Sequence, residues 1–196
     1  MYEKDQFYHM SLYFDHLYHS RSQDPQAAGS FIRLHVIANS DETADQTLKK
    51  EVKDRVVTYL RSKMNQAASI QAARQVICQE MDALKEIAEK KIRQEGYDYP
   101  VTVSLGTTYF PVKEYGDMAF PAGDYEALRV QIGKSKGRNW WCVMYPSLCL
   151  VDGVYQTVPE NSKDKLKQVL STSEYQSLVD GGEDVQFRLR FFDWLF

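Results

Sequence analysis

The spacing of apolar and polar positions changes several times along the chain, and each change predicts a different element. Phe31 to Ala38 alternates loosely and runs into the polar residues 39–41, which predicts a strand followed by a turn. A helix from Thr43 to about Met64 is predicted next, because an apolar residue recurs every fourth position. The residues of this stripe are Leu48, Val52, Val56 and Leu60.

Polar residues mark where the helices should begin and end. Thr43 and Gln46 fit a capping box, in which the hydroxyl and the amide side chain each satisfy a backbone group at the helix start. Ser69 can cap a second helix, which continues until Gly96 supplies a left-handed stop. The inward-facing residues of that helix are Ile70, Ala73, Ile77, Leu84, Ala88 and Ile92. We therefore expect two long helices in succession.

The period then shortens to that of strands. Residues 99–105 alternate and precede a possible bend at Gly106, and residues 128–132 alternate in the same way. The segment 133–137, with a glycine at each end, predicts a turn that pairs residues 128–132 with the following Trp-rich stretch as a hairpin. Toward the C-terminus we expect short helices at 163–170 and 174–179, a turn at 181–182 and a last strand at 185–191.

This order of elements predicts an α/β or α+β fold. We expect a single globular domain over residues 30–196, with a mixed sheet covered by the two long helices. Residues 1–29 form a variable N-terminal segment that thins into a linker-like Ser/Gln/Asp/Pro/Ala/Gly stretch. It shows no charged start, apolar run or cleavage site of a secretory signal peptide.

Two interpretations of the N-terminal segment stay open. Four apolar residues at helical spacing permit a short amphipathic helix that contacts the domain or a membrane surface. They are Phe7, Met10, Phe14 and Leu17. A flexible polar tail is the alternative, and it is favoured over metal binding for His9, His16 and His19.

Composition and charge exclude several classes of function. With 196 residues and 43% hydrophobic content, the chain can bury a substantial core. It carries 24 Lys and Arg against 27 Asp and Glu, so it lacks the basic excess that binds a phosphate backbone, and we expect no nucleic-acid partner. Its apolar runs are short, the richest being interrupted at Pro146, and none is long enough for a membrane helix.

The candidate catalytic groups are weak. Residues 133–135 lack the leading glycine of a phosphate-binding loop, and the carboxylates at 114–126 are more typical of solvated turns than of a metal site. Cys142 and His35 could pair as nucleophile and base, which leaves a cysteine-dependent cell-wall hydrolase as the alternative function. We expect no metal, no cofactor and no enzymatic activity.

Three stretches carry a more specific indication. LHVIANSD at 34–41, PAGDYEAL at 121–128 and NWWCVMYPSLC at 139–149 occur in this order. Together they resemble the stage II sporulation protein R family of endospore-forming bacteria, and the resemblance covers roughly residues 31–152. It implies a signalling protein that is made in the forespore and secreted into the space between the forespore and mother-cell membranes. There it would switch on a membrane-embedded aspartic protease that processes the mother-cell sigma-E precursor. Members of the family usually begin with a signal or anchor helix, which this sequence lacks.

The implied compartment bears on the cysteines. In an oxidising space, Cys142 and Cys149 could form a disulfide that closes a short loop, with Cys78 left as a buried thiol. The alternative is that all of these cysteines stay reduced and pack as small apolar side chains.

The tryptophan stretch also has two interpretations. Trp140 and Trp141 are neighbours in a predicted strand and should face opposite sides, so only one of them must be structural. The other is either core or an interface hot spot beside Arg138 and Asn139. The resemblance implies that the partner is the extracytoplasmic part of the protease. We expect its binding surface to combine this stretch with Tyr125, Glu126 and Arg129.

Overall fold

The computed structural model describes residues 29–64, 67–146, 149 and 158–181. Its centre is a four-stranded sheet with the strand order β2-β5-β1-β6. The strands are β1 (Ile32–Ile37), β2 (Val101–Phe110), β5 (Gly123–Ile132) and β6 (Asn139–Tyr145). β1 runs parallel to β5 and antiparallel to β6, while β2 runs antiparallel to β5. The predicted mixed sheet is confirmed.

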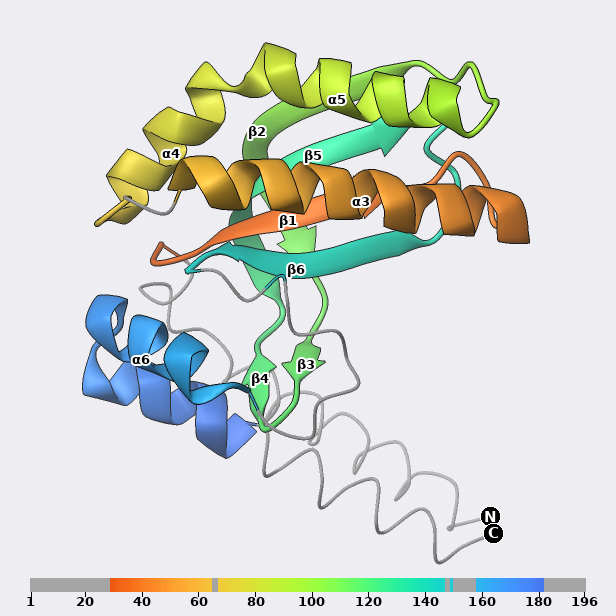
Figure 1. Cartoon of the computed structure of the whole chain (residues 1–196). Coiled ribbons are helices and arrows are strands. Elements are labelled where there is room, and N and C mark those ends of the chain that lie inside the picture. The colour runs from red at the N-terminus through yellow and green to blue at the C-terminus, as the bar shows by residue number, and fades with distance from the viewer. Residues whose placement is uncertain (1–28, 65–66, 147–148, 150–157, 182–196) are drawn as a thin grey trace, which may run out of the picture.

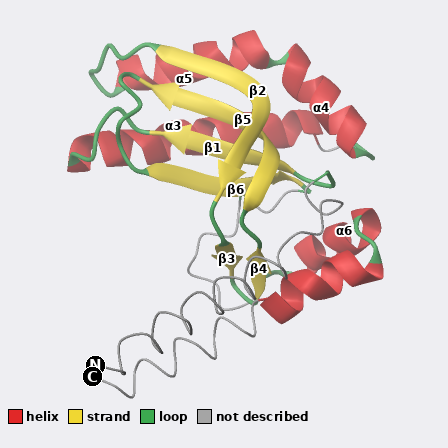
Figure 2. Ribbon diagram, turned by 180° about the vertical axis from the view of Figure 1, so that it is seen from behind, coloured by secondary structure: helices red, strands yellow, loops and turns green. Residues whose placement is uncertain are grey.

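Helices cover one face of this sheet. They are α3 (Thr43–Met64), α4 (Ile70–Gln79) and α5 (Met81–Gln94), and Figure 1 shows them as a layer over the strands. The view from behind presents the strands in front and the same helices beyond them (Figure 2). Within the described part of the chain, the opposite sheet face therefore has no such helix layer. The α/β fold class is confirmed.

The helix boundaries agree only partly with the predicted caps. The Ser69 hydroxyl accepts the Ala72 N–H at 3.2 Å, and Gly96 takes a φ of +83°, so both predicted signals are confirmed. The capping box is wrong, because the Gln46 side-chain amide donates instead to the Ser40 carbonyl oxygen at 2.9 Å.

The predicted second long helix is wrong as a single element. It divides between α4 and α5 at Glu80, whose backbone leaves helical geometry at φ −98° and ψ 7°. The Glu80 carboxylate accepts a hydrogen bond from the Tyr59 hydroxyl and pairs with Lys63 Nζ at 3.0 Å. Both partners lie on α3, so contacts across the layer hold the chain at this change of direction.

The predicted hairpin is also wrong, because β5 and β6 are not neighbours. β1 lies between them, parallel to one and antiparallel to the other. The loop 133–138 must therefore span two strand spacings, about 9–10 Å. In doing so it crosses the end of β1, where the Gly137 N–H donates to the Ala38 carbonyl at 3.0 Å.

A smaller layer lies beyond the sheet. The hairpin β3 (Lys113–Tyr115) and β4 (Met118–Phe120) stands next to α6 (Glu160–Val169) (Figure 1). Asp117, in the turn of this hairpin, accepts the Val158 N–H and pairs with Lys163 Nζ, each at 2.7 Å. The α6 residue Leu166 belongs to the same buried cluster as the sheet core.

The C-terminal predictions are tested only in part. The expected helix at 163–170 corresponds to α6, and residues 172–181 are also helical, so both short helices are confirmed. Gly181 is helical and not in a turn. The predicted strand at 185–191, the N-terminal apolar residues and the three histidines at 9, 16 and 19 lie outside the described residues.

Candidate partner-binding surface

The adjacent tryptophans face opposite sides of β6, as predicted. Trp140 lies on the helix-covered face, where Lys53 Nζ of α3 is 4.4 Å from its ring centroid. Trp141 lies on the other face and stacks on His35, with ring centroids 3.8 Å apart and an interplanar angle of 18°. Both indoles are partly buried. One tryptophan thus belongs to the helix–sheet contact and the other to the face without the helix layer.

Positively charged and aromatic side chains gather on that second face. In the sheet register His35 lies beside Arg129 of β5 and Trp141 of β6, and Arg33 precedes His35 by two positions on the same side. We call Arg33, His35, Arg129 and Trp141 the cationic face. This grouping depends on β1 being the strand between β5 and β6.

Arg33 is the most buried member of the cationic face. It is 0% exposed, and its guanidinium carbon lies 4.2 Å from the Phe110 centroid and 4.7 Å from the Tyr125 centroid. Nη2 donates to the Tyr115 hydroxyl at 3.1 Å, while Nε and Nη1 have no hydrogen-bond partner within the described part of the chain. The aromatic ring faces stabilise a cation that would otherwise be costly to desolvate.

His35 is held in its neutral form on the same face. Burial lowers its pKa, the Asn139 side chain opposes this, and the positive charge of Arg129 lowers the pKa further. Neither ring nitrogen has a hydrogen-bond partner with normal geometry among the residues that the structure describes. His35 therefore presents a stacked, uncharged imidazole with unused donor and acceptor capacity.

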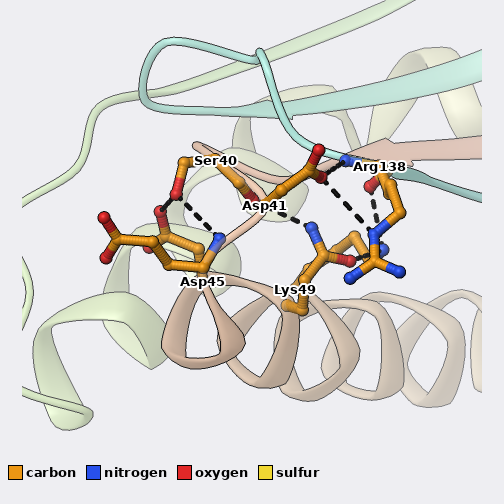
Figure 3. Close-up of polar contacts among 7 residues, drawn as sticks. Ser40, Asp41, Asp45, Lys49 and Arg138 are labelled. Atoms are coloured by element: carbon orange, nitrogen blue, oxygen red, sulfur yellow. Dashed lines mark hydrogen bonds and ion pairs between the residues drawn. The ribbon is translucent and has the colours of Figure 1, made fainter.

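A polar junction ties the end of β1 to α3 (Figure 3). The Asp45 carboxylate accepts hydrogen bonds from Asn39 Nδ2 at 2.8 Å and Ser40 Oγ at 2.6 Å. Burial alone would raise the pKa of Asp45, but these hydrogen bonds hold it below its ordinary value. The ANSD residues of the quoted motif thus hold together the turn that starts the helix.

The same junction positions Arg138 (Figure 3). Its N–H donates to Asp41 Oδ1 at 2.6 Å, and its carbonyl accepts from Lys49 Nζ at 2.9 Å. Its side chain is 73% exposed, with Nε 3.5 Å from the same Asp41 oxygen. The backbone is held from two sides while the guanidinium points to solvent, and the adjacent Asn139 is also exposed.

The residues predicted on β5 do not form one surface. Tyr125 is 3% exposed and its hydroxyl donates to the Pro121 carbonyl at 2.8 Å, so it packs in the core and offers no exposed contact. Glu126 points to the helix side and forms a two-point ion pair with Arg74 at 2.7 and 2.8 Å. Arg129 joins the cationic face. The partner-binding role of the other residues of the predicted binding surface, which are exposed or partly buried, stays a prediction.

The candidate disulfide is present. Cys142 and Cys149 are bonded, with their Cα atoms 5.2 Å apart. The expectation for Cys78 is wrong, because it is exposed on α4 while the preceding Ile77 points into the core. Cys142 aligns with Leu34, and His35 aligns with Trp141. Leu34 and His35 are consecutive in β1 and face opposite sides, so the Cys142 sulfur and the His35 imidazole lie on opposite faces of the sheet. The nucleophile–base pair considered from the sequence is not assembled.

Sequence reasoning missed Arg33 and its partner Tyr115. The available signal was a charged residue inside FIRLHVIA, a run that is buried at every position. A buried charge needs compensation. Nothing local to the run shows that the aromatic residues around Arg33 come from β2, β5 and the β3–β4 hairpin.

The described residues hold neither a metal-binding cluster nor a membrane-spanning helix. No three His, Cys, Asp or Glu side chains in the described ranges are grouped so as to hold a metal ion. Among the helices of the described part, none combines the length and the apolar character needed to cross a membrane.

A family model and a curated relative of this chain both point to the same family. The family model for Stage II sporulation protein R matches residues 28–155, which include all three quoted stretches. Stage II sporulation protein R of Bacillus subtilis (strain 168) is 37% identical over 134 residues, which are 68% of this chain and 60% of the relative. The chain thus spans about 60% of the length of that relative. No solved structure matches. With the match covering β1, α3 to α5 and the strands that carry the cationic face, the chain belongs to the stage II sporulation protein R family.

Proposed function

We propose that this protein is an exported sporulation signal that binds the extracytoplasmic part of a membrane-embedded aspartic protease. Binding activates the protease, which then processes the sigma-E precursor of the mother cell. Family membership supports a role in sporulation. The place of action under this proposal is the space between the forespore and mother-cell membranes, and the protein acts as a ligand with no chemistry of its own.

The observation that carries the proposal is the bond between Cys142 and Cys149. Disulfides persist in oxidising compartments and are rare in the reducing cytosol. This one joins Cys142, in the middle of β6 and directly after the tryptophan pair, to Cys149 beyond the strand. It supports an extracytoplasmic place of action.

Exposed groups next to this strand suit a protein partner. The backbone of Arg138 is held by Asp41 and Lys49, and its side chain is exposed. A contact group on an ordered backbone loses less conformational entropy on binding than one on a free loop. Asn139 and Trp141 continue the same edge of the sheet and extend the available contact area.

The alternative of a cysteine-dependent hydrolase is less well supported. Its nucleophile needs a free thiolate within reach of a base. Here the Cys142 sulfur is bonded to Cys149, and the His35 ring lies on the other sheet face. An exposed Arg138 and a partly buried Trp141 beside a disulfide fit a binding protein better.

The proposal is tested in a non-sporulating bacterial host that carries the protease and the sigma-E precursor. The protein is either exported with the signal sequence of another secreted protein or kept in the cytoplasm. Precursor cleavage is followed by immunoblot. We expect cleavage only with the exported protein. Equal cleavage in both cases would overturn the extracytoplasmic ligand, and so would none with a folded, exported protein.

A matched pair of variants refines this assay. Arg138→Gln removes the exposed guanidinium beside the sheet edge, whereas Arg61→Gln removes an exposed guanidinium from the distant end of α3. We expect Arg138→Gln to lower cleavage several-fold at limiting protein and Arg61→Gln to leave it unchanged. Equal effects would remove Arg138 from the contact surface.

A further inference from the structure

We propose that the cationic face is the docking site for an acidic peptide segment of the protein partner. The inference rests on the proposed function and adds the chemistry of the partner to it. Its site is the sheet face opposite α3, α4 and α5, centred on Arg129 with His35 and Trp141 beside it.

The upper part of this face is open along β2 (Figure 2). Thr102 is exposed, and a β-carbon added at Gly106 would meet no atom within 4 Å. Both residues lie on the same side of the sheet as Ser104, which aligns directly with Arg129. A glycine inside a strand leaves room for another backbone to approach closely. A peptide can therefore lie across β2 and reach Arg129.

The charge of the face is one-sided. Following the register, the described positions of β1, β2, β5 and β6 on this side include the charged Arg33 and Arg129, the uncharged His35, and no Asp or Glu. By contrast, the helix side already pairs its Glu126 with Arg74. Among the described residues no carboxylate pairs with Arg33 or Arg129, so the complementary ligand is an anion.

The buried nitrogens of the cationic face also favour an anionic ligand. Among the described residues, Arg129 Nε is buried without a partner, as are Nε and Nη1 of Arg33 and the ring nitrogens of His35, one of which is a donor in the neutral imidazole. Unsatisfied buried donors are costly, and a group that supplies their missing acceptors recovers that cost. Carboxylates match guanidinium groups with paired, charge-assisted hydrogen bonds. Arg129 is the residue that contacts the carboxylate. Arg33 is fully buried and contributes only its positive electrostatic potential.

The flanking side chains favour a peptide over a small anion. The partly exposed Trp141 indole, which stacks on the buried His35 ring, forms a flat wall on this face, against which aliphatic or aromatic neighbours of the carboxylate can pack. A free anion makes no use of such a wall. An acidic protein segment uses both the charge and the stack.

The direct test is an NMR titration of the full, oxidised chain with an Asp/Glu octapeptide. A Lys octapeptide and inorganic phosphate serve as comparison ligands. We expect the acidic peptide to shift the Arg129 Nε–H and Trp141 Nε1–H signals, and the Lys peptide to leave them in place. Binding of phosphate as tight as that of the acidic peptide would overturn the peptide assignment. So would shifts elsewhere in the molecule only.

Ser104 provides a matched pair of variants for the same titration. Ser104→Glu places a carboxylate opposite Arg129, at the short distance of cross-strand neighbours, and so occupies the site from within. Ser104→Gln introduces a side chain of nearly the same shape as glutamate but without its charge. We expect roughly tenfold weaker peptide binding for Ser104→Glu and less than about twofold change for Ser104→Gln. Equal affinities would contradict the inference, and Arg129→Gln gives the same loss by an independent route if Ser104→Glu does not fold.

The cleavage assay separates this inference from the proposed function. If the exported wild type triggers cleavage and Ser104→Glu does so equally well, the docking site is wrong and the function stands. If the wild type triggers no cleavage but binds the acidic peptide as described, the function is wrong and the site stands.

Discussion

Gly137 lies so close to Ser40 that a β-carbon on Gly137 would stand 2.1 Å from the Ser40 carbonyl oxygen. Two connections meet at this point: the turn that leaves β1 and the loop that carries the chain from β5 over β1 to β6. The close contact explains why this crossing needs a residue without a side chain.

Gly137→Ala should therefore be strongly destabilising. The added methyl group meets backbone atoms, so one of the two connections must move, and we expect a loss of about 2–4 kcal/mol in the free energy of unfolding. Urea unfolding followed by circular dichroism measures it. Gly106→Ala is the control, because a β-carbon there meets open space, and it should be neutral or slightly stabilising. Similar losses in both variants would contradict the crossing.

The Asp45 carboxylate should make folding dependent on acid pH. Its pKa is held below the ordinary value by hydrogen bonds from Ser40 and Asn39. A depressed carboxyl pKa contributes stability above the ordinary value, and this contribution is lost as pH falls through the folded pKa.

Asp45→Asn should lose about 1–3 kcal/mol at neutral pH and progressively less as pH falls below the ordinary carboxyl pKa, because the stability that the ionised carboxylate contributes is lost in that range. Urea unfolding from pH 3 to pH 7 measures the difference. Asp54→Asn, at a side chain that is 66% exposed, should show no comparable effect. A cost for Asp45→Asn that is independent of pH would remove the ionised carboxylate from the junction.

The disulfide should stabilise the fold around β6. Cross-linking a loop with a sequence separation of 7 lowers the entropy of the unfolded chain. The expected stabilisation is about 2.5 kcal/mol. Cys142→Ser combined with Cys149→Ser should lower the free energy of unfolding by about that amount and lower the melting temperature with it, and the reduced wild type should match the double variant. Cys78→Ser changes an exposed side chain and should leave the melting temperature in place. No difference between oxidised and reduced protein would rule out the bridge.

The Tyr115 hydroxyl should hold the β3–β4 hairpin against the sheet. It accepts from Arg33 Nη2 and donates to the Trp141 carbonyl, each at 3.1 Å. Tyr115→Phe leaves both groups without this partner, and we expect a loss of about 1–3 kcal/mol. Tyr109→Phe is the matched control because its side chain is 61% exposed. Equal stability of the two variants would show that this hydroxyl contributes nothing.

Local patterns were enough to predict much of the fold. The strand at β1, the cap at Ser69 and the stop at Gly96 each depend on a few consecutive residues, and all are confirmed. The opposite orientation of Trp140 and Trp141 follows from the period of a strand in the same way.

Long-range pairing was not predictable from these patterns. The position of β1 between β5 and β6 depends on contacts between segments far apart in the sequence, and no local period encodes it. This one relationship determines the loop crossing, places Arg129 beside His35 and leaves Tyr125 in the core. The break at Glu80 was missed for a similar reason, since the groups that hold it lie on α3.

The most direct test of the central claim is addition of the purified, oxidised protein to the outside of protoplasts. The protoplasts carry the membrane protease and the sigma-E precursor but do not make this protein. We predict precursor cleavage that rises with the added concentration and saturates. An equal amount of heat-unfolded protein should cause no cleavage. No cleavage at any concentration of the folded protein, in protoplasts whose protease cleaves when this protein is made and exported within them, would contradict a ligand that acts from outside.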